Sequence, residues 1–160
     1  EADIVIAIDR PKSGPYIITR LSNYCLKLYG SQHYLQQNPE IKKLEDLQQH
    51  RFVDYIDDLV YSTALYSLER LPLQVSACFR SNSILAQEIA VRAGAGLAIL
   101  PKFLVNDKSE LKEVLGQQLS FTHTFWMLTL VDLQHEPKIK LVWDFLRKQA
   151  DLQQDLLMGR

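Results

Sequence analysis

An arginine followed by small polar residues is the part of the chain best suited to chemistry. Arg80 precedes Ser81, Asn82 and Ser83. Such residues cap helix N-termini, because a short side-chain oxygen accepts a hydrogen bond from an unpaired backbone N–H group. A cation next to the free N–H groups of a helix N-terminus favours an anion. We therefore predict a ligand-binding segment here, although capping alone would also explain its composition.

The segments around these residues predict a βαβ unit. Leu73–Phe79 alternates like a half-buried strand, and Leu97–Leu100 is a short apolar run that Pro101 ends. Between them we expect a helix that ends at Gly94 and buries a broad apolar face formed by Ile84, Leu85, Ile89 and Val91. Strand, helix and strand in this order are typical of a parallel sheet, which binds ligands at the carboxyl ends of its strands.

The rest of the chain reads as a mixed α/β protein without repeats. An apolar strand over 3–8, expected to be covered on both faces, precedes a loop rich in proline and glycine at 11–15. A helix is expected from Pro137, where apolar residues recur at helical spacing. The other expected elements are strands over 17–21, 24–29, 51–56, 119–122 and 124–131, a short helix capped by Ser31, one over 59–68, one over 102–105, and one around 111–115.

Composition and motifs argue against several classes of protein. The formal net charge of −1 gives no general attraction for nucleic acid, and no apolar run is long enough to span a membrane. The histidines lack metal-ligand spacing, and the sequence has no nucleophile elbow or phosphate-binding loop. We therefore predict a non-enzyme with no catalytic residue, metal or cofactor. Cys25 and Cys78 are interpreted as buried, reduced thiols, with a redox switch as the alternative.

Gly94–Pro101 reads G-A-G-L-A-I-L-P. It resembles the signature G-x-G-[IL]-[AS]-x-[LV]-P near the end of the effector-binding domain of LysR-type transcriptional regulators. Tyr34 stands where that family usually has proline. Further pieces of the family pattern occur in the expected order: Ala2–Ile8, Tyr24–Leu35, Leu44–Phe52, Phe125–Val131 and the helix from Pro137.

The resemblance implies an α/β, two-lobed type II periplasmic-binding-protein-like fold, with one lobe nearly complete and the other partial. Residues 1–30 and 123–160 would form part of the first lobe, and residues 31–122 the second. The implied function is to bind a small-molecule effector, in particular an organic anion, between the lobes of a cytoplasmic homodimer or homotetramer. DNA would be bound through a helix-turn-helix domain that precedes this segment.

The resemblance also adds weaker ligand-binding candidates to Arg80 and Ser81–Ser83. Tyr55 and Asp57 follow a second-lobe strand and are expected to line the cleft, although Asp57 is first a helix cap. Arg10 lies in the loop that, in the family, borders the mouth of the cleft, although a solvated arginine is the simpler interpretation.

Two other functions share this fold, because fold does not determine function. The first is a periplasmic substrate-binding protein of a transport system, which would carry a signal peptide in place of the helix-turn-helix. The second is a regulator-like domain that serves in oligomerisation and binds no effector.

Overall fold

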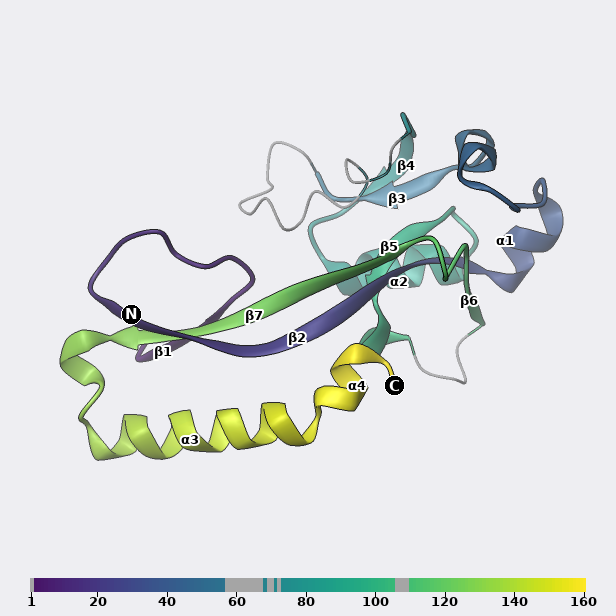
Figure 1. The fold of residues 1–160 in the computed structure, drawn as a ribbon. Coiled ribbons are helices and arrows are strands. Elements are labelled where there is room, and N and C mark those ends of the chain that lie inside the picture. Colours follow the sequence, from purple (N-terminus) through teal and green to yellow (C-terminus); the bar gives the residue numbers. More distant parts are fainter. Residues whose placement is uncertain (1, 57–67, 69–70, 72, 106–109) are drawn as a thin grey trace. The chain divides into compact units, whose positions relative to one another are not determined.

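The chain forms two compact units in a computed structural model that describes residues 2–56, 68, 71, 73–105 and 110–160 (Figure 1). Unit 1 comprises Glu1–Cys25 and Thr122–Arg160, and unit 2 comprises Leu26–Phe121. Two long strands, β2 (Tyr16–Ser31) and β7 (Ser120–Leu130), run from one unit into the other. Each unit is described separately below.

In unit 1, the sheet order is β1 (Ile4–Ala7), β7 and β2, and β1 pairs antiparallel with β7. The sequence predicted a break at Ser22 and Asn23 in the region of β2, and a second break at His123 in the region of β7. Both breaks are wrong, because each region is one continuous strand. The polar side chains have partners within the unit: the Thr124 hydroxyl donates a 2.8 Å hydrogen bond to Asn23 Oδ1. A strand with such partners need not be interrupted.

Strand β1 was expected to be covered on both faces, which is wrong for the described residues. Val5 and Ile6 remain 38% and 51% exposed. Strand β1 is the terminal strand of the sheet, with β7 as its pairing neighbour, so the described chain covers it incompletely.

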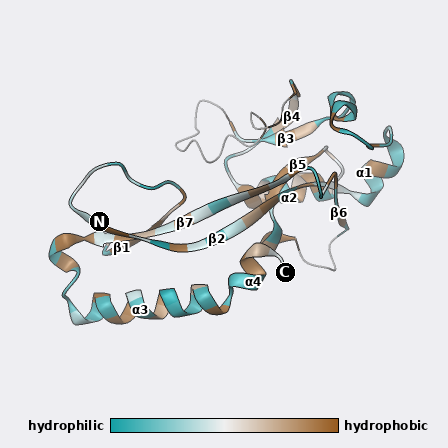
Figure 2. Cartoon of the chain, viewed as in Figure 1, coloured by the Kyte–Doolittle hydropathy of each residue, from teal (hydrophilic) through white to brown (hydrophobic). Residues whose placement is uncertain are grey.

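Helix α3 (Pro137–Leu152) begins at Pro137, as predicted, and α4 (Gln154–Met158) follows it. Ile139 is buried, whereas Leu141 and Phe145 are exposed, so α3 carries apolar residues on more than one face. Figure 2 shows this mixture of hydrophobic and hydrophilic residues along α3. Gln153 separates the two helices and is the C-cap of α3.

In unit 2, a helical segment follows the end of β2. Ser31 caps α1 (Gln32–Gln37), as predicted, and its hydroxyl oxygen accepts a 3.2 Å hydrogen bond from the backbone N–H of Tyr34. A 3₁₀ helix, η1 (Leu44–Gln49), leads to β3 (Phe52–Asp54). The capped start of α1 could be predicted from the sequence because the cap and the N–H group that it binds are only three residues apart.

The predicted strand–helix–strand unit is present as β4 (Ala77–Arg80), α2 (Ile84–Arg92) and β5 (Ala98–Pro101). The two strands of this unit are parallel because β4 and the residue before β5 each pair with β3, which lies between them. Strand β4 pairs parallel with β3, and Leu97 forms a parallel bridge with Phe52. Strand β5 itself also pairs antiparallel with β2, so the parallel sheet expected from the sequence is present only in part.

The predicted helix around residues 111–115 is also wrong. Leu111–Glu113 forms β6, which pairs antiparallel with β2 after the 3₁₀ turn η5 (Lys102–Leu104). Leu111 is opposite Ser31 in this pairing and is 5% exposed. The free strand edge of β2 and the burial of Leu111 outweigh the helical spacing of the apolar residues.

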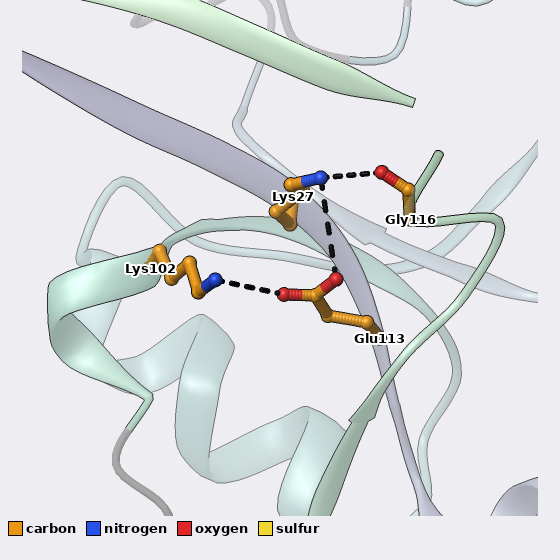
Figure 3. Close-up of polar contacts among 4 residues, drawn as sticks. All are labelled: Lys27, Lys102, Glu113 and Gly116. Atoms are coloured by element: carbon orange, nitrogen blue, oxygen red, sulfur yellow. Dashed lines mark hydrogen bonds and ion pairs between the residues drawn. The ribbon is translucent and has the colours of Figure 1, made fainter. Parts of the chain in front are cut away.

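Charged side chains join β2, β6 and the start of η5 (Figure 3). The ammonium group of Lys27 lies 4.0 Å from the Glu113 carboxylate and donates a hydrogen bond to the carbonyl oxygen of Gly116. Lys102 lies 3.5 Å from the same carboxylate. The cluster holds the turn after β6 against β2.

The two cysteines lie in strands, as predicted, but differ in burial. Cys25 is buried in β2, whereas Cys78 in β4 is exposed, so the expectation of two buried thiols is wrong for Cys78. Among the described strands β4 pairs with β3 alone, which leaves its other side uncovered. In the described part of the chain, no helix has the length and apolarity needed to cross a membrane.

Tyr34 and His50 form a buried polar pair in unit 2. The Tyr34 hydroxyl lies 3.2 Å from His50 Nδ1 and accepts a 3.0 Å hydrogen bond from the backbone N–H of Arg51. Both side chains are nearly inaccessible, at 2% and 4% exposure. Burial lowers the pKa of His50, and the Pro39 carbonyl and the Asp46 carboxylate partly oppose this effect.

We expect the free energy of unfolding to fall as the pH is lowered below about 6.5, the ordinary value for histidine. Because the folded-state pKa of His50 is lowered, the unfolded chain binds more protons in that window, and stability is complete only above it. Urea unfolding between pH 7.5 and 5.5 measures the slope of the unfolding free energy against pH. His50→Gln should flatten it, and replacing the exposed His33 with glutamine should not. An unchanged slope in His50→Gln would contradict this assignment.

Candidate functional site

The start of α2 is organised by the two serines of the predicted binding segment. Ser83 is the N-cap residue, and its hydroxyl oxygen accepts a 3.4 Å hydrogen bond from the backbone N–H of Ala86. The Ser81 hydroxyl oxygen accepts a 3.2 Å bond from the backbone N–H of Ser83. Within the described residues, neither hydroxyl donates a hydrogen bond to another protein group. Both can therefore donate to a ligand while they cap the helix.

The parallel pairing of β3 and β4 brings their carboxyl ends together next to this helix. The backbone N–H of Ser81 donates a 2.9 Å bond to the Asp54 carbonyl oxygen. The Arg80 guanidinium donates a 3.1 Å bond to the Tyr55 carbonyl oxygen, and Asn82 Oδ1 accepts a 3.0 Å bond from Ile56 N–H. Tyr55 and the residues from Arg80 to Ser83 thus belong to one cluster in unit 2, with the Tyr55 side chain 9% exposed.

Gln87 supports the cluster from inside and was missed from the sequence. Its side-chain amide donates a 2.6 Å hydrogen bond to the Ser81 carbonyl oxygen, and the residue is 1% exposed. A glutamine in the middle of a helix is usually a surface residue, so its spacing of six positions from Ser81 was the only available signal.

The buried face of α2 is only partly the one that the sequence predicted. Val91 is buried and Ile84 packs against the core, as predicted. Leu85 and Ile89 are 57% and 62% exposed, whereas Gln87 and Glu88 are buried. Glu88 is paired with Arg92, and Gln87 with Ser81, so both buried polar groups have partners. Paired polar groups can be buried at small cost, which allows the helix to turn this face inward.

Two weaker candidates are not part of the cluster in unit 2. Arg10 lies in unit 1, where its guanidinium carbon is 5.4 Å from the centre of the Trp126 ring. It lines a shallow surface pocket with Lys12, Ser13 and Ile18. Asp57 and residues 59–67 of the helix expected over 59–68 lie outside the described residues.

The cluster in unit 2 has the chemistry of an anion site. It combines the Arg80 charge, two serine hydroxyls and the N-terminal end of a helix of nine residues. The helix dipole and the unpaired N–H groups of the first turn favour a negative group here. Among the described residues, no group of three or more His, Cys, Asp or Glu side chains comes together as a metal site would require.

A family model described as "LysR substrate binding domain" matches residues 1–151. The chain belongs to this family. It is the effector-sensing domain of a LysR-type transcriptional regulator, and its fold is the two-lobed, type II periplasmic-binding-protein-like fold, present in part. The family and its structural neighbours are regulators and not enzymes, and they do not favour the transport-protein alternative.

Solved structures show the same fold at low sequence identity. The regulatory domain of CrgA, a LysR-type regulator from Neisseria meningitidis, has a TM-score of 0.77 and 20% identity, with 92% of this chain and 75% of that chain covered. The regulatory domain of AphB variant C227S from Vibrio vulnificus gives 0.69 and 18%, with 90% and 77% covered. That of CcmR from Synechocystis PCC6803, solved with 2-PG, gives 0.73 and 17%, with 94% and 74% covered.

The chain spans about half of a longer solved chain of CrgA, of which it covers 52%. No protein of curated function matches the sequence.

Proposed function

We propose that this domain binds a small organic anion at the start of α2, and that binding controls DNA binding and transcription by the full regulator. The observation that carries the proposal is the cluster at the carboxyl ends of β3 and β4, where Arg80 and two serine hydroxyls meet a helix N-terminus. Asn82 and Tyr55 extend this site, whereas Arg10 in unit 1 and Asp57 stay weaker ligand-binding candidates that the sequence alone proposes. The 2-PG complex of CcmR supports a small ligand as the effector class.

The proposed mechanism is a change in the relative orientation of two lobes, with residues 1–30 and 123–160 in the first lobe and residues 31–122 in the second. A ligand shifts such an equilibrium only when it binds one arrangement more tightly than the other. The full protein acts in the cytoplasm as a homodimer or homotetramer and binds DNA through a helix-turn-helix domain, as its membership of this regulator family supports.

We expect a thermal-shift screen of small organic acids, amino acids and sugars to find a stabilising acid. A ligand at about 100 times its Kd stabilises the folded state by about 2.7 kcal/mol. Arg80→Ala should weaken that ligand at least tenfold, because a hydrogen bond to a charged group contributes about 1.5–3 kcal/mol.

Matched controls are Arg147→Ala in unit 1 and Ser76→Ala in unit 2, which remove the same chemical groups from exposed positions. Ser81→Ala should weaken the ligand less than Arg80→Ala does. Equal affinity in Arg80→Ala and the parent would contradict the site. Absence of any stabilising compound with the full-length regulator would favour a domain that serves in oligomerisation without sensing.

A further inference from the structure

The C-terminal helix α4 contacts β2 close to the point where that strand leaves unit 1. Gln154 Oε1 accepts a 2.9 Å hydrogen bond from the Ser22 hydroxyl, and Gln154 Nε2 donates a 3.3 Å bond to the Asn23 carbonyl oxygen. Ser22 is 3% exposed and Gln154 is half-buried, so water has only partial access to this contact. Unit 1 ends at Cys25, two residues beyond Asn23.

The same short segment is tied to the other connecting strand. Thr124 donates a hydrogen bond to Asn23 Oδ1, and the ring of Tyr24 stacks on Phe125 with centroids 4.2 Å apart. Tyr24 also meets His123 edge-on at 5.7 Å. These partners on β7 follow Phe121, the last residue of unit 2, within four positions. The two connections between the units are therefore joined to each other and to α4 on the unit 1 side.

Gln154 lies outside the part of the chain that the family model matches, which ends at residue 151. Residues 22–25 lie inside β2, next to the boundary between the two units, and side-chain contacts that hold this stretch to unit 1 oppose bending there.

We propose that α4 acts as a strap, in which Gln154 fixes Ser22 and Asn23 and so limits the movement of unit 2 relative to unit 1. With the strap in place, residues 22–25 move with unit 1. Without it, this stretch of β2 bends more readily, and the units sample more orientations. The fraction of molecules competent to bind an effector then falls, and the apparent affinity falls with it.

The test compares Gln154→Ala with Gln149→Ala, the same replacement in α3, where the side chain makes no hydrogen bond within the described residues. Hydrogen exchange of the amides of residues 22–25 should become about fivefold faster in Gln154→Ala, as expected for loss of a net hydrogen bond. Residual dipolar couplings, measured separately for the two units, should show weaker alignment of one unit relative to the other. Gln149→Ala should change neither quantity.

Ser22→Ala removes one of the two contacts from the other side, and we expect it to reproduce both effects more weakly. Faster exchange with unchanged dipolar couplings would show that Gln154 stabilises β2 locally, and would overturn the proposal. Unchanged exchange and couplings in both variants would overturn it as well. The consequence for sensing rests on the proposed function, but both measurements use the ligand-free chain, so a failed effector site would leave their results unaffected.

Discussion

Replacing Gly96 with alanine is expected to lower the free energy of unfolding of unit 2 by about 3 kcal/mol. A Cβ atom at this position would lie 2.4 Å from the carbonyl oxygen and 2.7 Å from the carbonyl carbon of Arg51. These are backbone atoms, and they cannot rotate away as a side chain would. The Arg51 carbonyl oxygen also accepts a 2.8 Å bond from Leu97 N–H, so displacing it disturbs the contact between β3 and the residues before β5.

Gly94→Ala is the matched control within the same G-A-G segment. Gly94 has φ +83°, but the nearest atoms to an added Cβ are 3.7 Å and 3.8 Å away, which is ordinary contact. Alanine at this position is therefore expected to lower the free energy of unfolding by about 1 kcal/mol, which is the cost of placing a residue with a Cβ atom in the left-handed region. Urea unfolding followed by circular dichroism compares the two variants. Equal costs would show that the approach of Gly96 to the Arg51 backbone does not determine stability.

Unfolding of the two units can be followed separately in this experiment. The chain has two tryptophans, Trp126 and Trp143, and both lie in unit 1. Tryptophan fluorescence therefore reports on unit 1, whereas circular dichroism reports on the whole chain. If the units unfold independently, Gly96→Ala should shift the circular dichroism transition and leave the fluorescence transition in place.

Tyr34→Ala is expected to cost about 4 kcal/mol, because it removes a fully buried aromatic ring. Tyr34→Phe should cost about 2 kcal/mol, because His50 and the backbone N–H of Arg51 then lose their partner in a buried site. The geometry behind this expectation is the pair of contacts at 3.2 Å and 3.0 Å around the Tyr34 hydroxyl. Denaturant unfolding at pH 7.5 measures both variants.

Tyr16→Phe removes the same hydroxyl from a residue that is 39% exposed in unit 1, and it should be nearly neutral. If Tyr34→Phe were as mild as Tyr16→Phe, the buried hydroxyl would contribute nothing to stability. Tyr34 would then be a packing residue whose polar atom is incidental.

The features that the sequence predicted correctly depend on residues only a few positions apart. Ser31 and Ser83 cap helices, and Gly94 has the positive φ expected at the end of one. Pro137 begins α3. Capping and backbone restrictions act over a few residues, so the signal is present in the sequence itself.

The features that sequence predicted wrongly depend on partners far along the chain. Strand β6 forms because residues 111–113 complete the edge of β2, about eighty positions earlier. Helix α2 buries Gln87 because the Ser81 carbonyl oxygen accepts its hydrogen bond. The same limit applies to the candidate site. The cluster around Arg80 followed from strand order, whereas the role of Gln87 required the packing of α2 to be known.

The placement of unit 2 within the sequence of unit 1 has a consequence for synthesis on the ribosome. Ile4 in β1 pairs with Thr129 in β7, 125 positions later. At synthesis rates of about 5–20 residues per second, β1 waits roughly 6 to 25 s for its partner. Unit 2 ends at Phe121 and can complete its fold earlier. During that interval β1 lacks its strand partner, so the nascent chain exposes a short aliphatic segment that chaperones can bind.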